Sequence, residues 1–182
     1  MILNTSSAQS ALYALCGKNE GFRPFTGGCY LGLFKTVPND NGTGGEEVAT
    51  PGNNTKNYAR FNIAADTQMM NSVYNSVELG RATTLADRRV GNVKDINFNA
   101  ARNTTLPDPS QSGSEADWGT VKGFGIYTAA TGGTLVGWSA LAENQQVLVP
   151  ANTSFHFYAG YFELYIDDAG NIAANAVAAA GE

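Results

Sequence analysis

The segment WGTVKGFGIYTAATGGTLVGWSAL, residues 118–141, contains two strand-like runs joined by a short Gly-rich connection. Glycines also occur inside the runs, at Gly119, Gly123, Gly125 and Gly137. A glycine weakens a strand, and it often marks a bulge or a place where another backbone, an aromatic ring or a neighbouring subunit approaches closely. The pattern therefore favours packing and assembly over catalysis.

Similar strand-like runs occur on both sides of this segment. Upstream, CYLGLFKTV (29–37) and YARFNIA (58–64) alternate between two faces, and downstream come QQVLVP (145–150), TSFHFYA (153–159) and YFELYID (161–167). Short strands at a spacing of roughly 8 to 12 residues, with no helical pattern between them, are typical of antiparallel sandwiches and barrels. We therefore predict an all-β fold, a single antiparallel β-sandwich of jelly-roll-like type.

The two ends of the chain differ from this strand pattern. Residues 6–16, SSAQSALYALC, have helical spacing and predict a short N-terminal helix. Because 182 residues suit one domain, we expect an N-terminal helix or arm over 1–20, the β-sandwich over 21–168, and an Ala-rich C-terminal tail over 169–182. The sequence leaves open whether this tail is a helix, a flexible end or a segment ordered on a neighbour.

Composition narrows the classes of partner. Charged residues make up 15% of the chain, the formal net charge is -5 and the pI is near 4.8. We therefore expect no nucleic-acid partner, which would need a basic face, and no membrane span, because no apolar run approaches about 20 residues.

The start, MILNTSSAQS, lacks the pattern of a secretory signal. For Cys16 and Cys29 two free, buried thiols are favoured over a disulfide.

No constellation of reactive side chains stands out. His156, the one histidine, is expected on the polar face of its strand, because no nucleophile or metal-ligand spacing accompanies it. The pairs Glu46-Glu47 and Asp167-Asp168 are chain neighbours, which point to opposite faces of a strand and do not converge on one atom. We predict no catalytic residue, no cofactor and no metal site, and hence a protein that is not an enzyme; a hydrolase would need two carboxylates converging in a cleft.

Several short motifs follow one another in a recognisable order. They are Tyr30-Gly32-Leu33-Phe34, Glu47-Val48, Tyr58-Arg60, Trp118-Gly119-Val121, Gly125-Ile126-Tyr127 and Phe157-Gly160. With these motifs the chain resembles, over about residues 29–167, a family of small bacteriophage virion proteins usually labelled tail fibre or minor structural proteins. The segment 69–102 and the loop around Pro107 are longer than in compact members. The resemblance implies a non-enzymatic, β-rich component of a phage particle, assembled in the host cytoplasm.

The expected function is docking and assembly as a homo-oligomer with other virion proteins, of the tail or the major capsid. The expected interface lies on the loops 38–57 and 107–115, on the N-terminal helix and on the tail. Its named residues are Asn39, Asp40, Glu46, Glu47, Tyr58 and Tyr161, of which the tyrosines would act as anchors if they are exposed to solvent in the isolated chain.

Two alternatives stay open. The first is a capsid (head) decoration or head-fibre base protein, which copy number per particle would distinguish from a tail component. The second is a carbohydrate-binding module for a host-surface glycan. That module would require exposed aromatic rings on one sheet face, with Trp118 and Trp138 as the candidates to bind the sugar.

Overall fold

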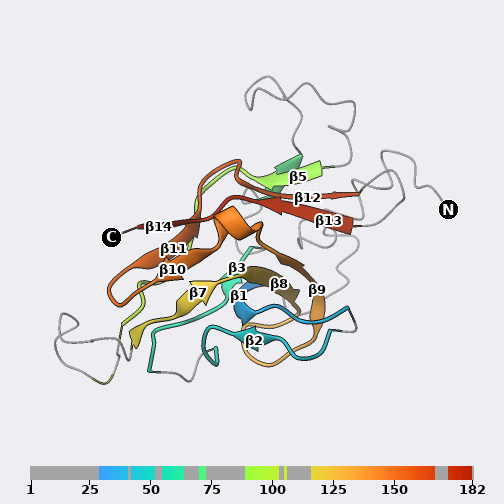
Figure 1. Ribbon diagram of the computed structural model, residues 1–182. Helices are drawn as coiled ribbons and strands as arrows, with labels where there is room; N and C mark the ends of the chain where they lie inside the picture. Colours follow the sequence, from blue (N-terminus) through green and yellow to red (C-terminus); the bar gives the residue numbers. More distant parts are fainter. Residues whose placement is uncertain are drawn as a thin grey trace.

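Strands dominate the part of the chain that the structure describes, and every strand pairing there is antiparallel (Figure 1). The computed structural model describes residues 29–40, 42–51, 55–63, 70–72, 89–102, 105, 116–166 and 172–181. Within these ranges the helical structure is the 3-10 turn Glu143–Gln145 together with Ala116, which also has 3-10 conformation. The predicted all-β class is confirmed.

The largest sheet is built around the first strand. Its order is β2 (Glu46–Glu47), β1 (Tyr30–Thr36), β8 (Gly123–Tyr127) and β9 (Leu135–Ala140), and β3 (Phe61–Asn62) also pairs with β1. The β1–β8 register places Leu31 opposite Ile126 and Leu33 opposite Phe124. All four of these side chains are buried, so they define the face of the sheet that turns toward the core.

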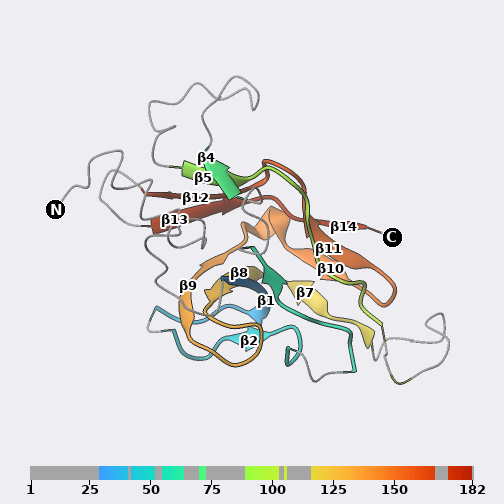
Figure 2. The same cartoon turned by 180° about the vertical axis from the view of Figure 1, so that it is seen from behind.

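Three smaller sheets complete the described structure. The first is β10 (Val147–Val149) with β7 (Gly119–Val121), the second has the order β14 (Ala179–Gly181), β11 (Ser154–Phe157) and β6 (Ile96–Asn97), and the third has the order β13 (Ile172–Ala176), β12 (Phe162–Ile166), β5 (Arg89–Asn92) and β4 (Met70–Ser72). Figures 1 and 2 show β12, β13 and β5 as one layer at the top of the view and the five-stranded sheet as a second layer at the bottom.

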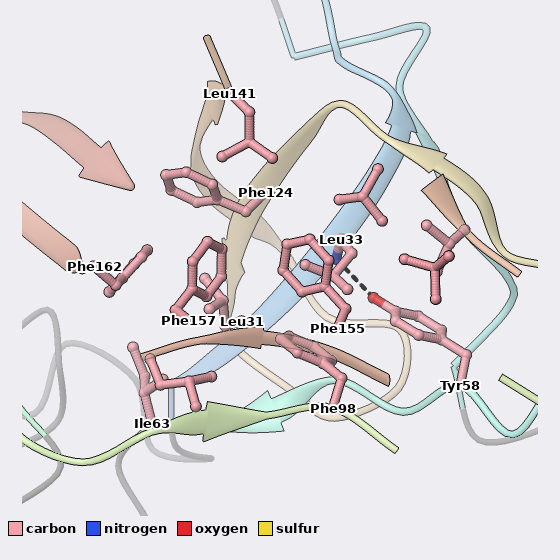
Figure 3. Close-up of a cluster of buried hydrophobic side chains, with 14 of the residues drawn as sticks. Leu31, Leu33, Tyr58, Ile63, Phe98, Phe124, Leu141, Phe155, Phe157 and Phe162 are labelled. Atoms are coloured by element: carbon pink, nitrogen blue, oxygen red, sulfur yellow. Dashed lines mark hydrogen bonds between the residues drawn. The ribbon is translucent and has the colours of Figure 1, made fainter. Parts of the chain in front are cut away.

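The hydrophobic core lies between these layers (Figure 3). The Phe124 ring of the five-stranded sheet contacts Phe157 of β11 and Phe162 of β12, with ring centroids 6.0 and 5.2 Å apart. Edge-to-face geometry of this kind suits the quadrupoles of aromatic rings. Because each fully buried phenylalanine contributes about 1.5–3 kcal/mol relative to exposure, these rings fix the two layers against each other.

The strand glycines have different roles. A Cβ on Gly125 would lie 2.7 Å from Leu135 Cδ1 and from Phe34 Cε2, and one on Gly123 would lie 2.6 Å from the Ser139 carbonyl oxygen. These two positions make room for neighbouring groups, as expected from the sequence. Gly119 instead has φ +76°, a left-handed conformation that L side chains rarely adopt.

The strand predictions are confirmed in outline and corrected in detail. The run 118–128 divides at Lys122 into β7 and β8, and among the described residues 58–63 only Phe61 and Asn62 form a strand. The Ala-rich tail, left open by the sequence, supplies β13 and β14. The predicted N-terminal helix over 6–16 lies outside the described residues and gains no support.

No helix in the described part of the chain is long and apolar enough to cross a bilayer. Cys29 is fully buried with a free thiol, and burial raises the pKa of this thiol to about 12. Cys16 lies outside the described residues.

Candidate docking surface

The described residues contain no group of three or more His, Cys, Asp or Glu side chains that could hold a metal ion. The most concentrated polar chemistry in this part of the chain is an ion pair on the outer face of the five-stranded sheet. Arg60 Nη2 lies 2.7 Å from Glu47 Oε2, and Arg60 Nε donates to Glu47 Oε1 at 3.0 Å. The side chains are only 5% and 13% exposed respectively, so the pair is largely removed from water.

Each end of this ion pair is bonded to a different part of the sheet. Arg60 Nη1 donates to the carbonyl oxygens of Ala129 and Gly132, at 2.8 and 2.6 Å, in the connection between β8 and β9. Tyr58 donates its hydroxyl to Glu47 Oε1 at 2.9 Å and accepts the backbone N–H of Leu33 at 2.8 Å. The guanidinium therefore ties the segment before β3 to the Gly-rich connection that joins the two runs of residues 118–141.

Gly32 makes room for this arrangement. A Cβ at Gly32 would lie 2.6 Å from Glu47 Oε1 and 2.9 Å from Tyr127 Cε2. The Arg60 Cζ atom lies 3.3 Å from the centroid of the Tyr127 ring, a cation–π contact. We call Gly32, Glu47, Tyr58, Arg60 and Tyr127 the Arg60 cluster. Five residues from four of the ordered sequence motifs thus meet in one place.

Burial in this cluster changes the acid–base chemistry of its tyrosines. Burial, followed by the nearby Glu47 carboxylate, raises the pKa of Tyr58 well above its ordinary value. The same two causes raise the pKa of Tyr127 to about 12. Both phenols therefore stay protonated at neutral pH. The cluster offers no pair of carboxylates for acid–base catalysis and serves to hold the sheet together.

Two of the six residues predicted for the interface belong to this interior. Tyr58 is 1% exposed, so the condition set for its role as an anchor is not met. The alternation of YARFNIA puts Tyr58 and Arg60 on the same face, and in the structure Tyr58 bonds to Glu47 of β2 and Arg60 to the β8–β9 connection. Glu47 is engaged by Arg60 and Tyr58, which leaves its carboxylate few free acceptor sites.

The other predicted residues lie at the surface. Asn39, Asp40 and Glu46 are exposed, and Glu46 pairs with Lys35 at 2.7 Å where both side chains face solvent. Asn39 anchors a tight turn, because its carbonyl oxygen accepts the Gly42 N–H at 2.8 Å. Their role as contacts stays a prediction. The predicted loop 107–115 lies outside the described residues.

The two tryptophans expected on a sugar-binding face differ in exposure. Trp118 is 1% exposed, and its indole N–H donates to the Lys56 carbonyl oxygen at 2.8 Å. Trp138 is half-buried, and a Cβ on Gly42 would lie 3.3 Å from its ring. Trp118 is a core residue, and its substitution would report on folding and not on ligand binding.

Exposed aromatic rings are found instead on a turn between β11 and β12. Tyr158 and Tyr161 are each 49% exposed, and their ring centroids lie 6.4 Å apart at an interplanar angle of 75°. The Tyr161 N–H donates to the Tyr158 carbonyl oxygen at 2.9 Å, which closes the turn, and Gly160 has φ +79°. A positive φ at the third position of a β-turn requires glycine or a residue that tolerates this region. We call residues 158–161 the tyrosine turn.

The side chain of Asn92 forms hydrogen bonds to the backbone at both ends of the tyrosine turn. Its side chain is buried; Nδ2 donates to the Tyr158 carbonyl oxygen at 2.9 Å, and Oδ1 accepts the Phe162 N–H at 2.9 Å. The Asn92 carbonyl accepts the Gly160 N–H at 2.6 Å, and Asp95 Oδ1 accepts the Ala159 N–H at 2.8 Å. The turn is therefore bonded from both ends, and its two rings are presented on a fixed backbone.

The sequence predicted His156 on the polar face of its strand, but in the structure this face is covered. His156 is 8% exposed, because β14 pairs with β11 and Gly181 packs over the imidazole. Its Nε2 finds no hydrogen-bond partner among the described residues, and its ring meets Tyr158 edge-on at 4.5 Å. The imidazole therefore supports the tyrosine turn from the side of β11.

The sequence reasoning identified Tyr161 and missed Tyr158 and Asn92. The signal for Tyr158 was present, because the alternation in TSFHFYA places it opposite Phe155 and Phe157, and Gly160 marks the turn. No local signal marks Asn92, whose side-chain partners at the tyrosine turn lie 65 to 70 residues away in the chain.

A family model described as "Podophage GP4 fiber I protein gp80" matches residues 5–165. No curated protein and no solved structure matched the chain in the parallel comparisons. The match spans most of the chain, including the Arg60 cluster and the tyrosine turn, and it agrees with the resemblance carried by the ordered motifs. The chain therefore belongs to the podophage GP4 fiber I protein gp80 family, a family of fibre-type structural proteins of the bacteriophage virion.

Proposed function

We propose that this protein is a non-enzymatic structural subunit that docks onto other virion proteins through the tyrosine turn. The observation that carries the proposal is the pair of half-exposed rings, Tyr158 and Tyr161, on a backbone fixed by Asn92 and Asp95. Tyrosine is enriched among residues that dominate interface energies, because it contributes large contact area at a low cost in side-chain entropy.

Rigidity is the second support for this proposal. A contact that is already ordered in the free protein loses less conformational freedom on binding, and this raises affinity without added area. The side chain of the buried Asn92 contacts three backbone groups in or beside the turn, the Phe157 and Tyr158 carbonyl oxygens at 3.3 and 2.9 Å and the Phe162 N–H at 2.9 Å.

The surrounding surface suits a protein–protein contact. Val93, next to Asn92 in the chain, is 47% exposed, and the neighbouring Lys94 and Asp95 carry opposite charges. An apolar and aromatic centre with a few charges at its rim is the common anatomy of an interface. Several copies bound to a symmetric tail or to the capsid lattice would add such modest contacts into stable attachment.

The test is a double substitution, Tyr158→Ser with Tyr161→Ser, in phage particles that carry no other copy of the protein. We expect the variant to fold, because exposed positions affect stability little, and its amount per particle to fall at least about ten-fold, since one ten-fold step corresponds to about 1.4 kcal/mol of binding. Leu148→Ser, at an apolar residue that is 60% exposed on β10, is the matched control and is expected to be incorporated normally.

Quantitative mass spectrometry of purified particles measures the result. Normal incorporation of the double variant would contradict docking through the tyrosine turn. The wild-type copy number separates a tail component from a capsid decoration or head-fibre base, because it matches either the tail ring or the shell lattice. A variant that is incorporated normally but no longer binds host-surface glycans would support the carbohydrate-binding alternative.

A further inference from the structure

The tyrosine turn has a carboxylate beside its two exposed rings. Asp95 is exposed, and its Oδ1 accepts the N–H of Ala159, the residue after Tyr158, at 2.8 Å. This bond occupies one acceptor position, whereas the two oxygens of a carboxylate offer about four. Asp95 therefore helps to fix the turn and still presents a negative charge and further acceptor positions at the surface.

Aromatic rings next to a carboxylate are suited to hold a cation. The face of a tyrosine ring carries the negative part of its quadrupole, and it attracts an ammonium or guanidinium group placed over it. Tyr158 and Tyr161 are each 49% exposed, and their planes meet at 75°. A cation that reaches this turn therefore meets aromatic surface and the Asp95 carboxylate together.

The Arg60 cluster shows the same chemistry inside the chain. Its guanidinium carbon lies 3.3 Å from the centroid of the Tyr127 ring, and its nitrogens donate to the Glu47 carboxylate at 2.7 and 3.0 Å. An aromatic ring and a carboxylate thus hold an arginine within this fold. At the tyrosine turn the rings and the carboxylate are exposed instead of buried, so a cation of a partner can reach them.

We infer that the tyrosine turn receives a basic side chain of a different virion protein, held by Tyr158, Tyr161 and the Asp95 carboxylate. An arginine fits best, because its planar guanidinium stacks on aromatic rings and can donate two parallel hydrogen bonds to a carboxylate. The charge of the whole chain favours such a partner. With a formal net charge of -5, the chain attracts a basic surface at long range, and complementary charges contribute to the rate and specificity of association.

This inference rests on the proposed docking through the tyrosine turn, and it adds the chemistry of the partner. The competing possibility is an acidic partner that binds Lys94, the exposed neighbour of Asp95 in the chain. The negative charge is the better placed of the two, because the Asp95 side chain bonds directly to the turn backbone at Ala159. Substitutions at the two residues distinguish the two charges.

The test is a competition for places on the particle. Wild-type and variant full-length chains are produced together in infected cells, and quantitative mass spectrometry compares their ratio in purified particles with their ratio in the lysate. Asp95→Asn removes the charge but keeps an oxygen that can accept the Ala159 N–H, and we expect it to be about ten-fold under-represented in particles. Glu143→Gln makes the same change of charge at an exposed residue of the 3-10 turn and should keep the wild-type ratio.

A second pair of variants examines the rings. Tyr161→Phe keeps an aromatic face, whereas Tyr161→Leu keeps apolar bulk without it. Because a cation is attracted to the ring face, we expect the leucine variant to be at least about three-fold less represented than the phenylalanine variant. Thermal unfolding of the purified chains accompanies both experiments. If Asp95→Asn melts below the wild type, the comparison at Tyr161 decides, because both of its variants retain the backbone bonds of the turn.

Three outcomes would overturn the inference. The first is a folded Asp95→Asn variant that keeps the wild-type ratio, and the second is equal representation of Tyr161→Phe and Tyr161→Leu. The third is a loss with Lys94→Gln but not with Asp95→Asn, which would assign an acidic partner. In each case, continued loss of the double variant Tyr158→Ser with Tyr161→Ser from particles would leave the proposed docking intact and remove only the assigned cation.

Discussion

Tyr58 and Tyr161 were expected to play the same part, and the structure separates them completely. Tyr58 is 1% exposed, with a hydroxyl between Glu47 and the Leu33 amide, whereas Tyr161 is 49% exposed on a turn. The glycines show a parallel contrast, because Gly32 is crowded by Glu47 and Tyr127 while Gly137 has open space among the described atoms. A residue type therefore indicates a function here only through its neighbours.

The charged side chains of this chain are distributed unevenly between the Arg60 cluster and the exposed surfaces. The Arg60 cluster buries one ion pair to connect β1, β2 and the β8–β9 connection. The tyrosine turn instead presents two neutral rings beside the exposed Asp95 carboxylate. A buried pair depends on both partners, because removal of one leaves a charge with no compensation. An exposed carboxylate, by contrast, stays hydrated until a partner covers it, and it then needs a cation of that partner as compensation.

The largest expected effect comes from breaking the buried ion pair. Glu47→Ala leaves the Arg60 guanidinium 5% exposed without its carboxylate, and we expect a loss of about 3–5 kcal/mol in the free energy of unfolding. Chemical denaturation of the purified chain measures it. Lys35→Ala removes the exposed Lys35–Glu46 pair, whose side chains are 38% and 60% exposed, and should cost about 0–1 kcal/mol. Equal losses for the two variants would contradict the distinction between buried and exposed charges.

A smaller effect is expected from filling the space at Gly32. The added methyl of Gly32→Ala would lie 2.6 Å from Glu47 Oε1 and 2.9 Å from Tyr127 Cε2, and overpacking of this kind costs about 1–3 kcal/mol. Thermal unfolding compares this variant with Gly137→Ala, which adds the same methyl where no described atom is near. We expect Gly32→Ala to lower the melting temperature and Gly137→Ala to leave it unchanged or raise it. The reverse order would remove the contrast between the two glycines.

The fold class could be predicted because strand alternation and turn residues are local signals. TSFHFYA places Phe155 and Phe157 on one face, and both are fully buried in the structure. The distribution of strands among sheets could not be predicted, because β11 and β12 are adjacent in the chain but lie in different sheets. The tail was left open, since its alanines fit a helix as well as the edge strands that they form.

The candidate site was predicted less well than the fold. Alternation predicts which face of a strand a side chain occupies, but not whether another segment covers that face. Glu47 was expected at the interface as part of the loop 38–57 and Tyr58 only if exposed, but Arg60 engages the Glu47 carboxylate and Tyr58 is buried. Asn92 acts through partners distant in the chain, which no single-sequence pattern contains.

The smallest expected effect concerns alkaline pH and the Arg60 cluster. Tyr127 has its pKa raised from 10.0 to about 12 by burial and by Glu47, so between these values the unfolded chain loses the phenolic proton while the folded chain keeps it. The unfolded state then binds fewer protons, and stability falls as the pH rises from 10 to about 12. Tyr127→Phe should make this fall less steep in denaturation curves taken across the window without abolishing it, because burial also raises the pKa of Tyr58 and of Cys29, which keep contributing to the loss. Tyr161→Phe removes a phenol from the exposed turn and should retain the wild-type fall; if both variants flatten it equally, the alkaline loss does not arise in the buried cluster.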